Sequence, residues 1–599
     1  MRLDLEELED YPTDKIPGFR ERIEALLPTM VKHECSEQKY GGFLIRVERG
    51  TWMGHVIEHI ALEIQTLAGM FSGYGRTRST HTRGIYNVVF AFVDEEAGRY
   101  AAEAGVRIAE ALIAGEPYDI DADIRELKAI GEKNALGATA QILVDEAKKR
   151  DIPWMRVEEE HAIQIGYGAN QVRIADMGKT ADPDASPQII AEIFTDEKPA
   201  RIPIIAITGT NGKTSTTRLL SHIIKNEGFT VGFTTTDGIY VNNILQEKGD
   251  NTGPISAKQV LQHTGVDFAV LETARGGILR SGLGFDKCDV GIITNIKEDH
   301  LGLNDIHDLD DLAKVKGVVA RSVNEDGWAV LNADDEHCVK IAADLDCYRA
   351  FFSMEQNNPV IAKRIAKGKT VAVVKDGWIT IKKGSEVTKI VEVATVPVTL
   401  NGKLKFMIAN VLAATLGAYV YGIPAESIKQ ALQTFTPDYE SMPGRMNLFT
   451  FNKFKVLVDY AHNPHGVAAV EDYVNTLHAT RKIGIISGVG DRRDEDIIEC
   501  AKISARFCDH IIIRKKLDMR GRTQDNVSAL LLEGIHLGKK DITHEIVLEE
   551  TDAIKHAMAI AGEGDLIIAL TDEITTVVEI IKEQLENEKG NAGRMNQSA

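Results

Sequence analysis

The stretch that decides the fold is Ala206–Thr217, which reads "AITGTNGKTSTT". It joins an apolar run typical of a buried strand ("IPIIAIT") to a helical pattern ("KTSTTRLLSHIIKNEG") that ends before Gly228. Glycines in such a loop let backbone N–H groups surround a phosphate, and the helix N-terminus favours an anion. The sequence therefore predicts a nucleotide-binding loop made of Gly209, Thr210, Asn211, Gly212, Lys213, Thr214 and Ser215.

Two side chains of this loop have expected roles. Lys213 would pair with the β- and γ-phosphates of ATP, and Thr214 would be a ligand of Mg²⁺. Ile207 occupies the place of the first glycine of the usual phosphate-loop pattern, so the loop is a variant. The alternative is a glycine-rich turn that binds no nucleotide.

Strands and helices alternate from Arg201 onward. Short apolar runs such as "FAVLETA", "VGIITNI" and "GWAVLNA" predict a mostly parallel sheet that is covered by helices. A β-rich insert precedes a second βαβ series, which begins near Asn447. We expect an ATP-binding α/β domain at 201–446, a Rossmann-like α/β domain at 447–586 and a flexible tail at 587–599.

The residues before the loop follow another pattern. Three segments in 1–165 have helical apolar spacing, and "GIYNVVFAFV" alternates like a strand, which predicts an α+β domain. Residues 166–200 are rich in Gly, Pro, Asp and Ser and indicate a linker. The whole chain is therefore expected to be an α/β multidomain protein.

Composition excludes several classes of function. The chain has 599 residues and a formal net charge of −20, which argues against a nucleic-acid-binding protein. Its six cysteines form no CxxC pair, and no apolar run is long enough to cross a membrane. We expect reduced thiols, no membrane segment and a cytoplasmic location.

Further motifs follow the loop in an order that resembles the Mur ligase superfamily. They are "LETARGGILRSGLGFD", "TNIKEDHLG", "LAKVKGVV", "NVLAA", "PGRMN", "VDYAHNPHG" and "GVGDRRDED". The resemblance implies a Mur-ligase central domain that uses ATP and Mg²⁺ for amide synthesis. It also implies a catalytic set of Lys213, Glu272, His300, Lys316 and Arg445.

The same resemblance assigns binding roles. Thr214, Glu272 and His300 would hold Mg²⁺, and Lys316 matches a lysine that is carbamylated in some members, with Lys314 as the fallback. The nucleotide would further contact Asn410, Arg445, Asp459 and His462. One departure concerns Phe406-Met407, where members often have His-Asn before this helix, so the adenine contacts are expected to differ.

The first block resembles the N-terminal domain of cyanophycin synthetases, over "HECSEQKYGGFLIRVERGTWMGHVIEHIALEIQTLAGM" and neighbouring segments. Such enzymes add Asp with an ATP-grasp domain and Arg with a Mur-like domain. "GYGANQVRI" resembles the entrance to the ATP-grasp domain, yet the phosphate loop follows after a short gap. The resemblance thus predicts a form of the enzyme without the ATP-grasp domain.

This resemblance implies a function. The chain would join Arg or Lys to the β-carboxylate of an aspartyl or polyaspartate-type substrate through an acyl-phosphate, without adding Asp to the backbone. Substrate-binding residues would be Thr236, Arg275, Arg280 and Asp491, with Asp494 as a further candidate. By analogy we expect a homo-oligomer, a dimer or tetramer, that acts alone or with a full-length cyanophycin synthetase. The alternative is a non-catalytic or regulatory subunit of a polymer synthetase.

A second metal site is a further hypothesis for the first block. His55, His59 and Glu63 share one helix face, so they could bind Zn²⁺ while Glu58 acts as a general base of a polymer hydrolase. His33, Glu34 and Cys35 are additional candidates by resemblance only. The alternative is a structural cluster of polar side chains.

Overall fold

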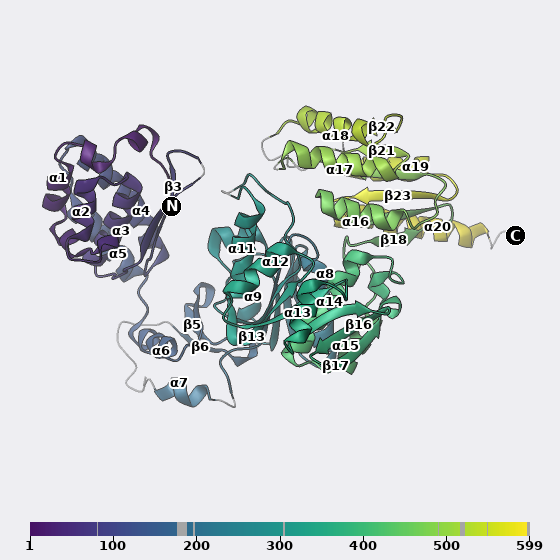
Figure 1. Cartoon of the computed structure of the whole chain (residues 1–599), viewed down its shortest axis with the longest axis horizontal. Coiled ribbons are helices and arrows are strands. Elements are labelled where there is room, and N and C mark those ends of the chain that lie inside the picture. Colours follow the sequence, from purple (N-terminus) through teal and green to yellow (C-terminus); the bar gives the residue numbers. More distant parts are fainter. Residues whose placement is uncertain are drawn as a thin grey trace. The chain divides into compact units, whose positions relative to one another are not determined.

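The computed structural model describes the chain except residues 81, 176–187, 196–197, 304–305, 489, 491, 515–521, 548 and 596–599, and except the side chains of 159 and 590–595. The described residues form two compact units. The first comprises residues 1–142, and the second comprises 143–175 and the chain after 187. Figure 1 shows the elements of both units.

The first unit packs helices around one central helix, α3. Its elements are β1 (Arg2–Asp4), α1 (Phe19–Leu26), α2 (Gly42–Arg49), α3 (Met53–Leu67), β2 (Gly75–Ser79), β3 (Ile85–Phe90), α4 (Glu95–Ala114) and α5 (Ile120–Lys133), with 3₁₀ turns at Glu6–Asp10, Thr13–Lys15, Pro28–Lys32 and Cys35–Glu37. The strands form an antiparallel sheet in the order β1-β3-β2. Phe19, Phe43 and Ile60 are fully buried in its core, so the predicted α+β character is confirmed.

The units divide at a different place from the sequence prediction, which put limits at residues 165 and 200. Helix α6 (Ala138–Lys149) crosses the limit between the units, and a small antiparallel sheet follows it, made of β4 (Trp154–Val157), β5 (Ala162–Ile165) and β6 (Val172–Ala175). This sheet belongs with the second unit because the Gln164 side chain donates to Leu261 O over 3.0 Å and Ala169 N donates to Val266 O. The 3₁₀ turns Glu158–Glu160 and Gly168–Asn170 and helix α7 (Gln188–Ile193) complete this segment.

A large sheet forms the centre of the second unit. Its strands are β7 (Ile204–Thr208), β8 (Val231–Thr235), β9 (Gly238–Val241), β10 (Ile244–Lys248), β11 (Phe268–Glu272), β12 (Cys288–Ile293), β13 (Val323–Asn332), β14 (Tyr348–Ser353), β15 (Thr370–Lys375), β16 (Trp378–Lys383) and β17 (Glu386–Glu392). The order is β10-β9-β8-β11-β7-β12-β13-β14-β15-β16-β17. Pairing is parallel from β8 to β15 and antiparallel at both edges, so the β-rich insert extends the sheet.

Helices cover both faces of this sheet, because the parallel strands are apolar on both sides. One face packs against α8 (Lys213–Asn226), α14 (Lys405–Tyr421) and α15 (Ala425–Thr434). The other packs against α9 (Pro254–Gln262), α11 (Leu309–Arg321), α12 (Glu336–Ile341) and α13 (Pro359–Ala366). Helix α10 (Arg275–Ser281) and 3₁₀ turns at Ala342–Asp344, Val393–Thr395 and Pro397–Thr399 lie between these elements in the chain.

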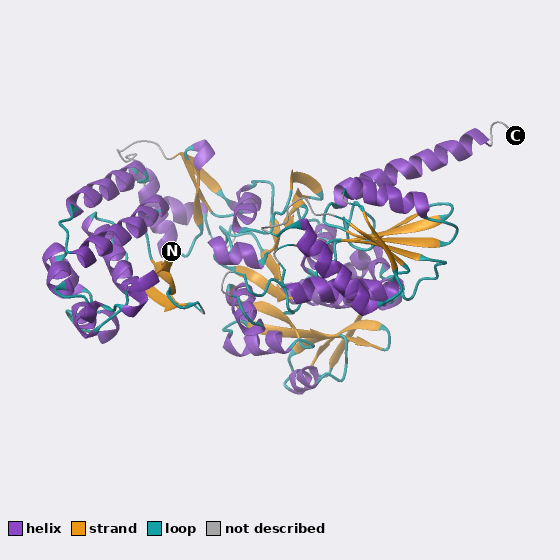
Figure 2. Cartoon of the chain, turned by 90° about the horizontal axis from the view of Figure 1, so that it is seen from above, coloured by secondary structure: helices purple, strands orange, loops and turns teal. Residues whose placement is uncertain are grey.

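A second doubly wound domain follows, as the sequence predicts. It comprises β18 (Asn447–Thr450), β19 (Phe454–Asp459), α16 (Pro464–Val474), β20 (Lys482–Ile486), α17 (Asp494–Phe507), β21 (His510–Ile513), α18 (Gln524–Gly538), β22 (Thr543–Ile546), α19 (Glu550–Ile560), β23 (Asp565–Leu570) and α20 (Ile574–Met595). The strand order is β18-β19-β23-β20-β21-β22, and Figure 2 shows helices on either side of the strands. Helices α16, α17 and α18 cover one face, and α19 and α20 cover the other.

The end of this domain differs from the sequence prediction. Helix α20 continues to Met595, past the limit predicted at residue 586, so the backbone of 587–595 is helical. Buried Val577 and Ile581 anchor this helix, and Glu588 and Lys589 favour its continuation, whereas Gly590 and Gly593 do not. The polar composition had indicated a frayed tail.

Candidate active site

The loop between β7 and α8 has the backbone shape that phosphate binding requires. Gly209 and Gly212 have φ angles of +153° and +85°, in the region that favours glycine. A Cβ atom on Gly212 would lie 2.1 Å from Asn410 Oδ1, and one on Gly209 would lie 1.8 Å from Thr294 Oγ1. Both glycines are therefore required by conformation and by space.

Side chains from the next strand hold this loop in place. Asn295, after β12, accepts from Asn211 N over 3.0 Å and donates to Asn211 O over 3.0 Å. Thr210 Oγ1 donates to Lys297 O and accepts from Lys297 N, each over 3.0 Å. The loop shape is thus set by neighbouring parallel strands that end at the same edge of the sheet.

Glu272, the last residue of β11, is a buried carboxylate that no hydrogen bond of good geometry satisfies. It is 2% exposed, and neither of its oxygens accepts a hydrogen bond of good geometry from the residues that the structure describes. Burial raises the pKa of its carboxyl, which the charge of Lys213, the nearby Thr214 hydroxyl and Arg445 partly oppose. Hard cations prefer carboxylate and hydroxyl oxygens, so these residues fit a Mg²⁺ ion.

His300 follows β12 and lies in a strained turn. Its φ angle is +54°, which is uncommon for a residue other than glycine. Arg275 Nη1 donates to His300 O over 2.9 Å and to Leu303 O over 3.3 Å. Arg275, predicted to bind substrate, thus supports the backbone of a predicted metal ligand.

Lys316, on α11, lies beneath the phosphate loop. Its Nζ donates to Gly209 O over 2.7 Å, and burial, together with the nearby charge of Lys213, lowers its pKa to about 7. A lysine with this pKa is largely uncharged at pH 8. Lys314, the fallback, is exposed and pairs with Asp311, so the structure favours Lys316 as the lysine of the site.

Arg445, which lies just before β18, and residues of the C-terminal domain contribute side chains to the same place. Arg445 Nη2 lies 3.3 Å from both Thr214 Oγ1 and Thr236 Oγ1, and its guanidinium lies over the Tyr460 ring at 4.7 Å. The side chains of Asn463 and Asn211 are hydrogen-bonded over 3.0 Å. The central and C-terminal domains thus meet at the phosphate loop.

Asp459 and His462 follow β19 beside these residues. The two oxygens of Asp459 accept from Met446 N and Ala461 N, each over 2.8 Å, and burial raises the pKa of its carboxyl. Burial lowers the pKa of His462 to about 4, and its Nδ1 lies 3.0 Å from Tyr460 O. The imidazole is therefore neutral, with the Nδ1 proton directed at that carbonyl.

One cavity of about 1130 Å³ brings most of the predicted residues together. Its lining includes Thr210, Asn211, Gly212, Lys213, Thr214, Ser215, Thr236, Glu272, Arg275, Arg280, His300, Lys316, Asn410, Arg445, Asp459 and His462. Gly209 contacts Lys316 through its carbonyl, and Asp491 lies outside the described residues.

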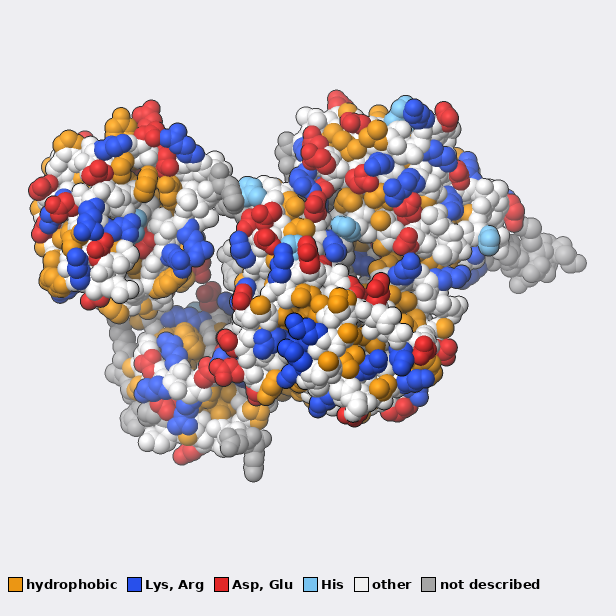
Figure 3. Space-filling model, in the orientation of Figure 1, with side chains coloured by type: hydrophobic (Ala, Val, Ile, Leu, Met, Phe, Trp, Pro, Cys, Tyr) orange, Lys and Arg blue, Asp and Glu red, His pale blue; other side chains and the backbone are white. Residues whose placement is uncertain are grey.

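The outer surface of the protein carries both kinds of charge. Figure 3 shows acidic and basic side chains interspersed over the face in view.

Several residues of the site were missed by the sequence reasoning. Asn463, Asn295 and Asp335 hold the loops, the last by accepting from Ile296 N over 2.9 Å. Phe406 lines the cavity, while Asn410 Nδ2 lies 3.6 Å from Met407 Sδ. The signal that could have found Asn463 is its place before Pro464, because Asn caps helix α16 there.

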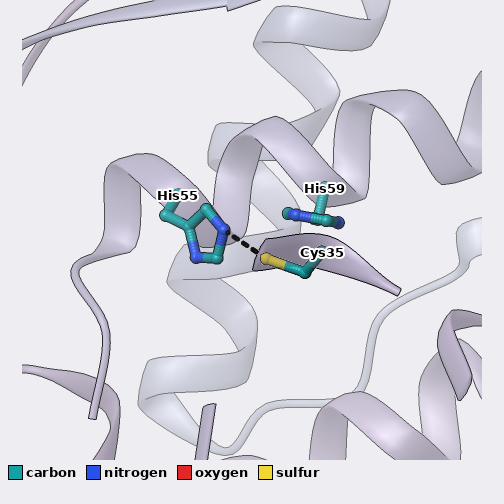
Figure 4. Close-up of side chains that lie close together, drawn as sticks. All are labelled: Cys35, His55 and His59. Carbon is teal, nitrogen blue, oxygen red and sulfur yellow. Dashed lines mark hydrogen bonds between the residues drawn. The ribbon is translucent and has the colours of Figure 1, made fainter. Parts of the chain in front are cut away.

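The first unit contains a separate cluster of histidines on α3. Ligand atoms of Cys35, His55 and His59 lie within 4.8 Å of one another, and Figure 4 shows the three side chains converging. Cys35 Sγ lies 3.2 Å from His55 Nε2. Burial lowers the pKa of His55 to about 4 and that of His59 well below its usual range, so both imidazoles are neutral.

The carboxylates of this cluster are differently placed from the prediction. Glu63 Oε2 is hydrogen-bonded to His33 Nε2 over 2.7 Å. Glu58 Oε2 accepts a hydrogen bond from Thr77 Oγ1 over 2.6 Å. Burial raises the pKa of Glu58 to about 7. The structure therefore groups Cys35 with His55 and His59, and Glu63 instead orients His33.

Comparisons with known proteins agree with this arrangement. Residues 1–114 match the cyanophycin synthase-like N-terminal domain, 207–418 the Mur ligase middle domain and 444–571 the Mur ligase glutamate ligase domain. Cyanophycin synthetase of Geminocystis herdmanii is 33% identical over 97% of this chain and 96% of that protein, and the one of Synechocystis is 32% identical over 97% of each. The chain belongs to the cyanophycin synthetase family.

The match also bears on the missing domain. The alignment with the Geminocystis enzyme spans 844 positions, whereas the present chain has 599 residues. Many residues of the Geminocystis enzyme are therefore aligned with gaps in the present chain. Each of the three matching family models describes an N-terminal or a Mur ligase domain, and none describes an ATP-grasp domain. The predicted form without the ATP-grasp domain is therefore confirmed.

More distant likenesses concern the Mur part. A 2,6-diaminopimelate ligase of Bacillus cereus is 25% identical over 63% of this chain and 75% of that protein. Among solved structures, "E.coli FolC in complex with DHPP and ADP" has a TM-score of 0.47 at 18% identity and covers 63% of this chain and 88% of that one.

These findings establish the class of reaction. This member of the cyanophycin synthetase family is an ATP-dependent ligase that forms an amide between an acid and an amino acid. Ligases of this type depend on ATP and Mg²⁺, which the loop and the buried Glu272 fit. Among the described residues, no helix combines the length and apolarity that a membrane span needs.

We predict that Glu272→Gln weakens Mg²⁺-dependent nucleotide binding about tenfold or more, since even outer partners of metal ligands are worth 10- to 100-fold. Calorimetric titration with ADP, with Mg²⁺ and with EDTA, measures the effect. Asp334→Asn is the control, because this cavity carboxylate already accepts from Ser353 Oγ and Met354 N. Equal loss in both variants, or no loss with Mg²⁺, would contradict the metal role.

We predict that stability depends on the charge of Lys316. Its folded pKa, about 7, lies below the unfolded value near 10.4, so the unfolded chain binds one more proton between these pH values. The melting temperature of the wild type should rise relative to Lys316→Met as pH increases from 7 to 9. Lys314→Met, an exposed change on the same helix, should track the wild type. A pH-independent difference between wild type and Lys316→Met would refute the lowered pKa.

Proposed function

We propose that this chain joins arginine or lysine to the β-carboxylate of an aspartyl substrate and does not add Asp to the backbone. The observation that carries the proposal is the shared cavity, which contains the phosphate loop, the unpartnered Glu272 and two arginines of α10. The choice of a basic amino acid follows from the resemblance to enzymes that attach Arg to Asp.

The cavity supports activation of a carboxylate by ATP. A carboxylate reacts poorly with an amine, whereas an acyl-phosphate has phosphate as a good leaving group. Lys213 and Arg445 would neutralise the charge that develops on the phosphoryl oxygens. Thr214, Glu272 and His300 would hold Mg²⁺, which when bound supplies further neutralisation of the phosphates.

The acidic substrate would enter beside α10. Arg280 lines the cavity and is exposed, so its guanidinium is accessible to a carboxylate. Arg275 is engaged with the His300 turn, which makes Arg280 the stronger candidate for substrate binding. In the C-terminal domain, Asp494 pairs with Arg522 over 2.6 Å, and this pairing weakens its case as a contact for the incoming amine.

The acceptor has to come from another reaction. A chain without an ATP-grasp domain needs an aspartyl substrate made by a ligase that forms the peptide backbone. A full-length cyanophycin synthetase is one such partner, and a separate acidic peptide is another. In both cases this chain would act on side-chain carboxylates only.

We predict that wild-type protein with ATP, Mg²⁺, arginine and an α-linked oligoaspartate releases phosphate and gains one arginine mass per acceptor. Mass spectrometry and a phosphate assay measure both products. Lys213→Met should reduce the rate by about 100-fold or more, because a group that acts on transition-state charge is removed. The same assay with aspartate in place of arginine tests the missing backbone activity, and the acceptor should gain no aspartate mass. Failure with every combination of acidic acceptor and basic amine would refute the proposal.

A second function of the first unit is favoured by one observation, the convergence of Cys35, His55 and His59. We propose that these residues hold Zn²⁺, for which thiolate and neutral imidazole are preferred ligands. Zn²⁺ would supply polarisation of a carbonyl or a bound water. Glu58, with its pKa near 7, would accept a proton at neutral pH as the base of a polymer hydrolase.

We predict about one Zn²⁺ per chain in the purified wild type and none in the Cys35→Ser/His55→Ala/His59→Ala variant, measured by plasma mass spectrometry after dialysis. His222→Ala, a half-buried histidine of the second unit, should keep the metal. Because neutral imidazole and thiolate bind the ion, occupancy should fall as pH decreases toward 5. A metal content that the triple variant retains would refute the site.

A further inference from the structure

The turn that carries His300 is held by its own domain at two points. On the N-terminal side, Lys297 exchanges hydrogen bonds with Thr210, and its Nζ lies 3.2 Å from Asp335 Oδ2. On the C-terminal side, Arg275 binds the carbonyl groups of His300 and Leu303. Between these points lie Glu298 and Asp299, whose side chains reach the C-terminal domain.

Asp299 forms an ion pair with Arg492 across the two domains. The Arg492 side chain is 4% exposed and that of Asp299 13%, so the pair is almost dry. Arg492 belongs to the loop after β20 and lines the active-site cavity. Removing one partner of a buried pair leaves an uncompensated charge, so a single substitution at this contact is more costly than one at a surface pair.

Two carbonyl groups, those of Gly490 and Arg492 itself, are held by a neighbouring arginine. Arg522 Nη2 donates to Arg492 O over 2.8 Å, and its Nε donates to Gly490 O over 2.9 Å. These bonds leave the Arg492 side chain directed at the central domain rather than at its own backbone. A guanidinium that is preorganised in this way loses little entropy on pairing.

A neighbouring pair provides a contrast. Arg493 Nη2 lies 2.7 Å from Glu298 Oε2, but the two side chains are 34% and 53% exposed. Arg493 also binds Asp496 of its own domain over 2.9 Å. Exposed ion pairs contribute little to stability because water screens them, so this second contact between the domains is weak.

We propose that Arg492 is a positioning residue for the ligase reaction, which couples closure of the C-terminal domain to the geometry of the His300 turn. When the domains separate, Asp299 loses its partner, and the strained turn keeps only the contacts within the central domain. His300 is then correctly placed only while the cavity is closed and water is excluded. This inference rests on the proposed role of His300 at the metal site.

The experiment compares Arg492→Gln, Asp299→Asn and the double variant. Each single variant should lower kcat about 10- to 100-fold, while KM for ATP changes less than about threefold, because the turn is displaced but the phosphate loop is intact. The phosphate released per amide should rise above about two, since a less firmly closed cavity admits water to the acyl-phosphate. The effects should not add in the double variant.

The double variant separates positioning from stability. It removes both buried charges, so its melting temperature should recover toward the wild-type value while kcat and the phosphate-to-amide ratio remain impaired. Arg493→Gln is the matched control and should change both quantities less than about twofold. Recovery of kcat together with stability, or equal effects of Arg492→Gln and Arg493→Gln, would overturn the proposal.

Closure can also be followed without any acceptor. Fluorophores at the exposed positions Glu325 and Glu533, one in each domain, report the separation of the domains with an ATP analogue and Mg²⁺. Arg492→Gln should raise the mean separation, whereas Arg493→Gln should not. If the wild type made no amide, the proposed substrates would be wrong, and this distance would still test the contact. An unchanged separation in Arg492→Gln would refute it.

Discussion

The active site is built around a buried carboxylate that the protein alone leaves unsatisfied. Both oxygens of Glu272 lie at the end of β11 without a hydrogen bond, in surroundings that disfavour their charge. Burying a carboxylate charge without enough partners costs free energy, so this position favours a cation. The charges of Lys213 and Arg445 offset part of that cost. A divalent ion bound with its nucleotide would offset the rest.

The parallel sheet explains how so many distant residues reach that carboxylate. Strands β7, β11 and β12 are neighbours and end at one edge, so the phosphate loop, Glu272 and the His300 turn start from adjacent positions. Ligand sites in open α/β sheets form outside the carboxyl ends of strands for this reason. Arg445, just before β18, and Arg492 of the C-terminal domain line the same cavity, and Asn463 binds the phosphate loop. Residues of both domains therefore line one cavity.

The two parts of the chain carry different kinds of polar cluster. In the second unit, charged groups surround a large cavity that suits anionic substrates. In the first unit, neutral imidazoles and a thiol converge at a partly buried place, where His59 stacks on Phe43 with ring centroids 4.3 Å apart. Burial keeps these imidazoles uncharged, which is the state that binds soft or borderline metals. The units thus offer separate chemistry without sharing residues.

Much of the site could be predicted from the sequence because it depends on local patterns. The phosphate loop needs glycine at positions with positive φ, and Glu272 follows an apolar strand directly, so both are visible in a short stretch. The resemblance preferred Lys316 to Lys314, and the structure adds that Lys316 is buried against Gly209 whereas Lys314 is exposed and pairs with Asp311. Asp299, Arg492 and Asn463 act through partners 193 or more residues away, and their types occur widely on solvated surfaces. Local sequence determined the phosphate loop, the order in which functional residues follow the strands, and the family. The reason is that backbone conformation and periodicity are local properties. Tertiary structure alone decided which charged groups are buried, which are paired across domains and which carboxylate is left without a hydrogen bond. The reason is that desolvation depends on neighbours that the chain brings together only when it folds.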